Sequence, residues 1–361
     1  MKEAFMQGKK NIAKLIADIA NPYRWITALR NYAFDKGWIK STAFDVPIIC
    51  IGNITVGGTG KTPHTEYLVR LLEKSGKVAV LSRGYGRKSK GYIMSNEKSP
   101  MSLIGDEPHQ IKTKFPQASV AVCEKRVTGV QNILAERKET GVILLDDAFQ
   151  HRHIKAGLYI LLVDSNRPIW NDCVLPFGRL RESDNGAKRA DIIILTKCSE
   201  NISRELMDDC KARLKTKEET PVFFSKMVYG KPYHLFEPQR HAAIEKGCNV
   251  LLLTGIAKPE PLKKEIESRG ANVTLAQFAD HHNFTTKDIE SIARTFDRLD
   301  GKKLIITTEK DATRLRGIQG LPAAIKENIY AMPIEIKIIN GEEDKFNQII
   351  TDYVTENKRN S

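Results

Sequence analysis

The chain has 361 residues, 41% of them hydrophobic and 28% charged, which is ordinary for a globular protein and long enough for about two domains. It contains no run of 18 or more apolar residues, so we expect no transmembrane helix. Its start has no basic segment that leads into a long apolar stretch, so we expect no secretory signal and predict a cytoplasmic location. The net charge of +13 attracts polyanions of any kind, but without an aromatic-studded RNA-binding strand or a helix-turn-helix we expect no nucleic-acid binding.

Residues 1–45 form a leader in which apolar side chains recur at helical spacing. Pro22 is expected to end or kink the first helix, because proline cannot continue the hydrogen bonding of a helix interior. Two interpretations stay open: an amphipathic helix that packs its apolar face on the protein, or a membrane-associating helix that lies on anionic lipid. The apolar positions are Ile12, Leu15, Ile16, Ile19 and Tyr23, followed by Trp25, Ile26, Leu29, Tyr32 and Ala33.

Residues 46–221 alternate short apolar segments with helical ones. Continuous apolar strands that alternate with helices are typical of a parallel sheet covered by helices on both faces, so we predict an α/β domain here. The expected strands cover 47–51, 78–81, 118–123, 141–145, 158–163 and 191–195, and the first expected helix covers 62–75.

A connector and a second, smaller α/β domain are predicted for the rest of the chain. Residues 222–245 contain two extended pieces around Gly230-Lys231-Pro232, which suggests a hairpin-like, two-stranded connector. Residues 246–361 are predicted to form the second domain, and a helix that returns to the first domain is one interpretation of the tail after residue 343. The expected elements are strands at 249–255, 273–278 and 303–307, helices at 259–268 and 289–299, and an extended piece at 329–338.

The strongest chemical signal is a glycine-rich loop between the first expected strand and helix. Glycines let the backbone turn its N–H groups toward phosphate oxygens, and the helix N-terminus adds a favourable dipole. Lys61 can reach the β- and γ-phosphates of a nucleotide, and the Thr62 hydroxyl can ligate Mg²⁺. This context predicts a P-loop (RecA-like) nucleotide-binding domain that uses ATP. The expected binding residues are Thr55, Val56, Gly57, Gly58, Thr59, Gly60, Lys61 and Thr62.

Two carboxylates end the apolar strand that covers 141–145. Asp146 and Asp147 stand where P-loop proteins place an acid near the magnesium ion, so we predict that they help to hold Mg²⁺. Either residue alone also suits the role of a helix N-cap.

Two further motifs offer acid–base groups. Asp106 precedes an expected helix, where it either caps the helix or accepts the proton of an acceptor hydroxyl. Asp280-His281-His282 follows a strand of the second domain. Adjacent histidines rarely bind one metal ion, so a histidine oriented by a carboxylate is the preferred interpretation, with His281 as the first candidate. Asp106, His281 and Lys61 are therefore the predicted catalytic residues.

Basic and polar residues on loops after the strands are candidates for substrate binding. Arginine can bind phosphate through two parallel hydrogen bonds, and the carboxyl ends of parallel strands open onto the ligand crevice. Thr196-Lys197-Cys198-Ser199 resembles the guanine-reading motif of GTPases, but Ser199 replaces its aspartate, which argues against guanine specificity. The candidates are Arg83, Tyr85, Arg126, Gln150, His151, Arg179 and Arg181.

These motifs together resemble the tetraacyldisaccharide 4'-kinase family of lipid A biosynthesis. The similarity runs in order through most of the chain, and Ala148 stands where the family more often has glycine. The segments that carry it are 52–63 (GNITVGGTGKTP), 82–86 (SRGYG), 105–108 (GDEP), 146–152 (DDAFQHR), 178–182 (GRLRE), 280–282 (DHH) and 308–312 (TEKDA).

The resemblance implies a specific reaction and location. The family transfers the γ-phosphoryl group of ATP to the 4'-hydroxyl of an acylated glucosamine disaccharide 1-phosphate, at the cytoplasmic face of the inner membrane. By this resemblance Asp106 is the base, a histidine of 280–282 supports it, Asp146 and Asp147 act near Mg²⁺, and the leader docks on the anionic membrane surface. The alternatives are a P-loop ATPase of the membrane-associated partitioning type, which has no small-molecule acceptor, and a non-enzymatic nucleotide-binding scaffold.

Overall fold

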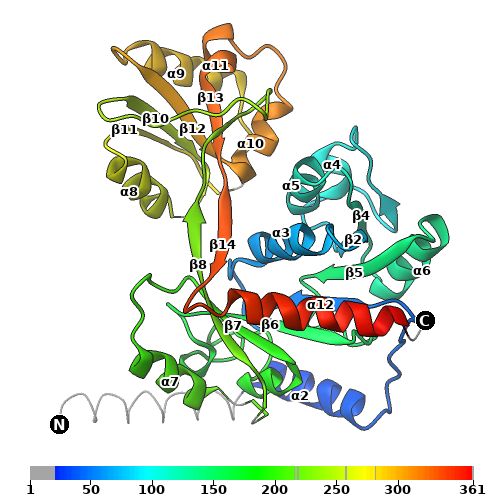
Figure 1. Ribbon diagram of the computed structural model, residues 1–361. Coiled ribbons are helices and arrows are strands. Elements are labelled where there is room, and N and C mark those ends of the chain that lie inside the picture. The colour runs from blue at the N-terminus through cyan, green and yellow to red at the C-terminus, as the bar shows by residue number, and fades with distance from the viewer. Residues whose placement is uncertain (1–20, 215, 218, 257, 281, 360–361) are drawn as a thin grey trace.

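Two α/β lobes make up the part of the chain that this computed structural model describes, residues 21–214, 216–217, 219–256, 258–280 and 282–359 (Figure 1). Within these residues, the first lobe is built on a nine-stranded sheet of order β14-β8-β7-β6-β1-β5-β2-β4-β3. The second lobe is built on a five-stranded sheet of order β11-β10-β12-β13-β9. Most strand pairs in both sheets are parallel, which confirms the predicted α/β class.

The first lobe follows the predicted alternation of strands and helices. Its strands are β1 (Ile48–Gly52), β2 (Lys77–Ser82), β3 (Ile93–Met94), β4 (Ser119–Val122), β5 (Thr140–Asp146), β6 (Leu158–Asp164), β7 (Ile192–Thr196), β8 (Val222–Tyr229) and β14 (Ile334–Ile338). Its helices are α2 (Pro22–Asp35), α3 (Lys61–Leu72), α4 (Met101–Ile104), α5 (Asp106–Lys114), α6 (Arg126–Glu136), α7 (Arg204–Arg213) and α12 (Glu343–Arg359).

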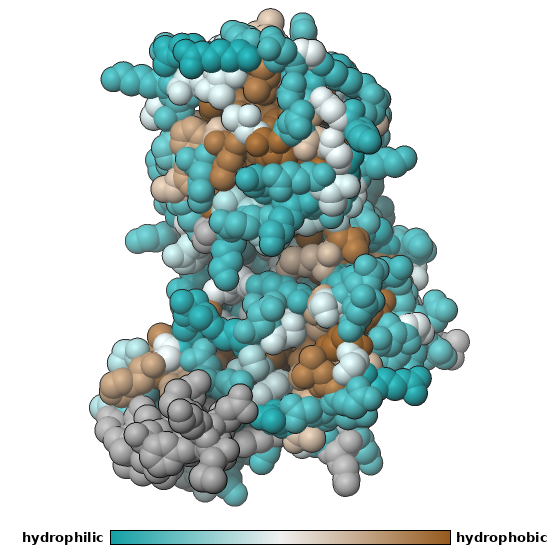
Figure 2. Space-filling model, turned by 90° about the vertical axis from the view of Figure 1, so that its left-hand side faces the viewer, coloured by the Kyte–Doolittle hydropathy of each residue, from teal (hydrophilic) through white to brown (hydrophobic). Residues whose placement is uncertain are grey.

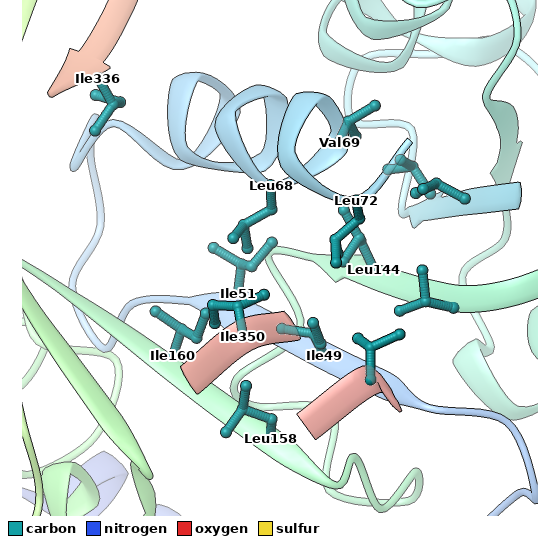
Figure 3. Packing of buried hydrophobic residues seen from close by; sticks show 14 of the residues in the cluster. Ile49, Ile51, Leu68, Val69, Leu72, Leu144, Leu158, Ile160, Ile336 and Ile350 are labelled. Atoms are coloured by element: carbon teal, nitrogen blue, oxygen red, sulfur yellow. The ribbon is translucent and has the colours of Figure 1, made fainter. Parts of the chain in front are cut away.

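Both faces of the first sheet are buried, because side chains of a strand alternate between its two faces. Ile49 and Ile51 of β1 pack with α3, α5 and α12 on one face, and Figure 3 shows Leu68, Val69 and Leu72 of α3 above them. Ile48 and Cys50 of the same strand point to the other face, where α6 covers the sheet. The continuous apolar strands of the sequence therefore reflect burial on two sides.

The second lobe has the same layered construction. Its strands are β9 (Tyr233–His234), β10 (Asn249–Thr254), β11 (Asn272–Gln277), β12 (Lys303–Thr308) and β13 (Ile329–Met332). Helices α9 (Thr286–Asp297), α10 (Glu309–Arg316) and α11 (Ala323–Asn328) pack on one face, and α8 (Glu260–Ser268) packs on the other.

The chain passes between the lobes in a two-stranded ribbon made of β8 and β14. These strands are antiparallel, with Tyr229 opposite Ile334 and Ser225 opposite Ile338, and Figure 1 shows them side by side between the lobes. The interpretation of 222–245 as a hairpin is wrong, because β8 pairs with β7 and β14 while β9 pairs with β13 in the second sheet. The extended pieces themselves were located correctly.

The C-terminal helix α12 returns to the first lobe, as one interpretation of the tail had it. Phe346, Ile350 and Val354 are buried in the same cluster as β1 and α3. The Tyr353 hydroxyl donates to the Ile48 carbonyl over 3.0 Å. The strand and helix after β13 therefore lie with the first lobe, although residues 246–361 were grouped as one domain; the other domain limits stay predictions.

Helix α2 begins at Pro22, a position whose N–H would have no partner within the helix, so the missing N–H of proline loses no hydrogen bond. Asn21 caps the helix, because its side chain accepts from the Arg24 N–H over 3.2 Å. The expected helix before Pro22 lies outside the described residues. Among the described residues, no helix is long and apolar enough to cross a bilayer.

Candidate active site

The glycine-rich loop joins β1 to α3 and exposes its backbone at the tip. Gly57 and Gly60 have φ angles of 111° and 87°, which side chains rarely adopt, and Gly57 and Gly58 are exposed. Gly60 is the N-cap of α3 and no side chain caps the helix there. The first N–H groups of the helix are therefore available to an anion such as a nucleotide phosphate.

Buried polar contacts fix the shape of this loop from below. The Thr196 hydroxyl donates to the Thr59 carbonyl over 2.9 Å, and the Asn53 amide donates to the Thr59 hydroxyl over 2.8 Å. The Lys197 ammonium donates to the Gly58 carbonyl and forms an ion pair of 2.6 Å with Asp164. The lysine that had suggested a guanine-reading motif thus supports the phosphate loop.

His64 connects the loop to the ribbon between the lobes. Its ring lies 2.7 Å from the Gly60 carbonyl and 3.0 Å from the Ser225 hydroxyl of β8. Burial lowers the pKa of His64 to about 4, so the ring is neutral near pH 7. A carbonyl only accepts, so Nδ1 donates to Gly60 and Nε2 accepts from Ser225.

Lys61, the first residue of α3, faces the carboxylate of Asp147. Their charged atoms are 3.6 Å apart, and Arg181 approaches the same carboxylate to 3.1 Å. Burial alone would raise the pKa of Asp147, but the charges of Lys61 and Arg181 outweigh it and lower that pKa. Asp147 is therefore an ionised carboxylate already matched by two cations.

Asp146 has the opposite environment. Its Oδ1 accepts from the Thr65 hydroxyl over 3.1 Å, while its Oδ2 is buried without a hydrogen-bond partner in the described structure. Burial and the neighbouring charge of Asp147 raise the pKa of Asp146. Burial and the charges of Asp146 and Asp147 also raise the pKa of Glu107, the second residue of α5. The raised pKa values of these two acids indicate that too little positive charge lies near them to offset their negative charges.

The described residues contain no group of three or more His, Cys, Asp or Glu side chains arranged to hold a metal by themselves. This agrees with the way proteins bind Mg²⁺ beside nucleotides, through one or two carboxylates plus substrate phosphates and water. Thr62, 9% exposed at the start of α3, and the Oδ2 atom of Asp146 are oxygen donors that suit such a site.

Asp106 begins α5 and faces the second lobe. The Arg314 guanidinium of α10 donates to its carboxylate across the boundary between the lobes. His281, the first histidine candidate, lies outside the described residues. His282 is oriented by Asp288, with 2.9 Å between Nε2 and the carboxylate, and its ring stacks on Phe278. The predicted carboxylate-oriented histidine is present at His282, with Asp288 in place of Asp280.

The substrate-binding candidates occupy different environments. Arg83 and Tyr85 are exposed, the latter to 79%. Arg126 is 3% exposed and donates to the backbone carbonyls of Cys123 and Asp146, which favours a role in holding strand ends. The side chains of Arg83 and Tyr85 make no such structural contact among the hydrogen bonds of the described residues.

The remaining candidates surround the phosphate loop. Gln150 donates to the Asn53 carbonyl over 2.7 Å, and Arg181 donates to Gln150 over 3.3 Å. The Arg179 carbonyl accepts from the Val56 N–H over 2.8 Å, while its side chain is exposed. Burial and the nearby positive charge of Arg126 lower the pKa of His151 to about 4.

Several residues of the site were not found from the sequence. Glu107 was noticed only as the neighbour of Asp106, although a pair of acids before a helix was the available signal. Arg314 gave no local signal, because its partner Asp106 is 208 positions away.

Gly52 supplies a test of how closely the site is packed. A Cβ atom there would lie 2.7 Å from Phe149 Cβ and 2.9 Å from the Phe149 backbone nitrogen. We expect Gly52→Ala to lower the free energy of unfolding by about 1–3 kcal/mol, because neither atom can move cheaply. Urea unfolding measures it, with Gly317→Ala as control, since that site has only an ordinary contact at 3.5 Å. Equal midpoints for both variants would contradict the packing argument.

Comparisons of the sequence and of the structure with known proteins identify the same family. The family model for tetraacyldisaccharide-1-P 4'-kinase (LpxK) matches residues 12–355. The tetraacyldisaccharide 4'-kinase of Bacteroides thetaiotaomicron is 45% identical over 363 residues, with 97% of this chain and 95% of that protein covered. That of Flavobacterium johnsoniae is 42% identical, with 96% and 98% covered. The crystal structure of "apo" form LpxK from Aquifex aeolicus in complex with ATP has a TM-score of 0.72 and 28% identity, with 92% and 96% covered.

Proposed function

The chain belongs to the tetraacyldisaccharide-1-P 4'-kinase family, and from that premise we propose how its residues carry out the reaction. It is an ATP-dependent kinase that phosphorylates the 4'-hydroxyl of a tetraacylated glucosamine disaccharide 1-phosphate, a step of lipid A biosynthesis. The observation that carries the proposal is that α3, which begins with Lys61 and Thr62, contacts α5, which begins with Asp106: Gln110 of α5 donates to Glu66 of α3 over 2.7 Å. The alternative of a partitioning ATPase is not favoured, because a kinase family matches nearly the whole chain.

Mg²⁺ is the second cofactor in this proposal, and Asp146 rather than Asp147 is its ligand. Asp147 is matched by Lys61 and Arg181, whereas Asp146 has an unpartnered buried oxygen and a raised pKa. Thr62 would supply a second oxygen, and Glu107 lies near enough to Asp146 and Asp147 for their charges to raise its pKa. When bound, the ion would supply positive charge that offsets the negative charge of the phosphates.

Asp106 is proposed as the general base. The 4'-hydroxyl passes its proton to Asp106 while its oxygen attacks the γ-phosphorus of ATP, the bond to the β–γ bridging oxygen breaks, and ADP leaves. Phosphoryl transfer of this kind depends on placement and charge stabilisation more than on covalent help. We keep His281 as the preferred supporting histidine, and His282 is the second candidate because Asp288 already orients it.

Lys61 is proposed to bind the transferred phosphate of ATP. Its ammonium lies 3.6 Å from the Asp147 carboxylate in the structure. Arg181 remains within 3.1 Å of Asp147, so that carboxylate keeps a cationic partner when Lys61 turns away. The exposed side chains of Arg83, Tyr85 and Arg179 are proposed to contact the acceptor.

Incubation with γ-labelled ATP and a tetraacyldisaccharide 1-phosphate tests the function. A labelled lipid is expected. Release of labelled phosphate without a labelled lipid would support the ATPase alternative, and no turnover of ATP would support a scaffold. The same reaction without added lipid measures the background of hydrolysis.

The enzyme is proposed to work at the cytoplasmic face of the inner membrane, with α2 on the anionic surface. Five large apolar side chains in and next to α2 are strongly exposed: Trp25 at 59%, Ile26 and Leu29 at 66%, Tyr32 at 48% and Trp38 at 70%. Figure 2 shows a group of hydrophobic atoms on the surface of the lower lobe. Positions 1–45 also hold eight basic and four acidic residues, and each basic residue near such a surface contributes about 1 kcal/mol.

Substitution of exposed residues tests this docking better than truncation of the leader. Arg30 donates to the Gln150 carbonyl and Asn31 to Glu182, so deletion of α2 would disturb the first lobe. We expect the Ile26→Gln, Leu29→Gln double variant to bind anionic liposomes at least about tenfold more weakly, because burial of each side chain contributes about 1.5–3 kcal/mol.

Leu206→Gln is the matched control, since Leu206 is 52% exposed on α7. Co-sedimentation of wild type should also weaken with salt, because exposed charges are screened beyond about 8–10 Å at moderate ionic strength. Equal liposome binding by the double variant and by wild type would exclude α2 as the docking surface.

A further inference from the structure

Helix α10 of the second lobe contacts both ends of α5 in the first lobe and the loop that carries the histidine motif. Glu309 pairs with Lys114 at the end of α5, and Arg314 pairs with Asp106 at its start. Between them, Lys310 pairs with Asp280, 3.2 Å away on the loop that continues to His282. The two helices therefore run antiparallel, joined at both ends by charges, and α10 also holds the histidine loop.

The ion pairs at the end of α5 form a buried cluster. The Lys114 ammonium lies 2.9 Å from Glu309 and 2.6 Å from Glu66 of α3. Side-chain exposure is 18% for Lys114, 6% for Glu309 and 2% for Glu66. Gln110 donates to Glu66 over 2.7 Å, and Tyr233 donates to Glu309 over 3.2 Å.

Buried charges are an energetically unfavourable means of holding the two lobes together. The Lys114 ammonium pairs with two buried carboxylates, those of Glu66 and Glu309. Burial together with the charge of Glu309 raises the pKa of Glu66. A buried ion pair often stabilises a protein no better than apolar side chains of the same volume would. Charged groups do restrict geometry, because a displacement leaves a buried charge without its partner. The cluster therefore suits a role in fixing position.

A second feature links the cluster to the chemistry. Glu66 lies on α3, which begins with Lys61 and Thr62, and Lys114 lies on α5, which begins with Asp106. In the same first turn of α10 as Glu309, Asp311 accepts from the Gly255 N–H over 2.9 Å and lies 3.3 Å from Arg314. Each helix is rigid over this length, so contacts at one end determine where the other end lies.

We propose that α10 is a two-point interlobe clamp and that Glu309 is a positioning residue that holds the histidine loop in register with Asp106. This rests on the proposed function, in which Asp106 and a histidine of 281–282 act together. Glu309 does not touch the reacting atoms. It acts through Lys114, which it fixes against α5 from the second lobe.

A matched pair of isosteric variants tests the clamp. Glu309→Gln removes the interlobe charge and leaves Lys114 with Glu66, whereas Glu66→Gln leaves Lys114 with Glu309. We expect kcat of Glu309→Gln to fall about 10- to 100-fold, the size of effect known for small misplacements. The KM for ATP should change less than about twofold, because the phosphate loop proposed to bind ATP belongs to the first lobe and not to α10. Glu66→Gln should lose less than about threefold in kcat.

Hydrogen exchange supplies a readout that does not depend on the acceptor. Amides of α10 and of 278–284 should exchange faster in Glu309→Gln than in wild type, and those in Glu66→Gln should not. Equal kcat losses in the two variants, or unchanged exchange in Glu309→Gln, would overturn the proposal. Failure of wild type to label the lipid would refute the proposed function instead, and the exchange comparison would still decide the clamp. Arg213→Met, which breaks the exposed pair with Asp209, is the control for loss of an ion pair as such.

Discussion

Lys61→Ala is expected to reduce kcat by on the order of 10²-fold or more while the protein stays folded. In the proposed transition state, the Lys61 ammonium stabilises charge that develops on the transferred phosphoryl group, and loss of one such group typically has an effect of this size. The fold should survive, because the shape of the loop depends on Thr59, Thr196 and Lys197 rather than on the Lys61 side chain. Asp147 also retains Arg181.

The measurement is single-turnover phosphorylation of the lipid acceptor, with circular dichroism and thermal unfolding to confirm folding. Lys74→Ala is the control, since Lys74 is exposed just beyond the other end of α3. A folded Lys61→Ala protein with near-normal kinase activity would exclude this loop as the site of transfer.

Asp106→Asn is expected to lower kcat by about 10²- to 10⁴-fold, the range known for loss of a general base. Asparagine has the same shape and can still accept a hydrogen bond from Arg314, but it cannot take up the hydroxyl proton. ATP affinity should change little, because the proposed nucleotide contacts are on the phosphate loop and the start of α3. Steady-state kinetics and direct ATP binding separate the two effects.

Asp209→Asn is a suitable comparison, because Asp209 also pairs with an arginine but on the exposed surface of α7. If the affinity for ATP falls sharply or the KM for the acceptor rises sharply in Asp106→Asn while kcat is retained, Asp106 is a binding residue. In that case Glu107 is the next candidate base, since it neighbours Asp106 and its pKa is raised.

The sequence was informative where the signal is local. Apolar runs located the central strands to within a few residues, because a strand buried on both faces leaves few polar positions. The phosphate loop was recognisable from its glycines and from the Lys61-Thr62 pair that follows them, and Asp146 and Asp147 stand at the end of an apolar strand. These features need only a short window of sequence.

Contacts between residues that are far apart in the chain could not be predicted from the sequence. Burial periodicity shows that β14 has an apolar face but not that β8, rather than a second-lobe strand, pairs with it. The interlobe pair of Lys114 and Glu309 joins residues 195 positions apart, and nothing local distinguishes either from a solvated charge. The motif at 308–312 was noticed only through the resemblance, and its contacts became visible in three dimensions.

The path of the chain through the ribbon also has a consequence for biosynthesis. The second lobe lies between β8 and β14, so it is an insertion within the first lobe. Phe346, Ile350 and Val354 complete the core around β1 and α3. Translation of the first lobe therefore begins before that of the second lobe and ends after it. Until α12 leaves the ribosome, the part of the apolar sheet face that α12 covers is exposed, whereas the inserted lobe already has all of its strands. Such exposed surface is what chaperones bind during synthesis.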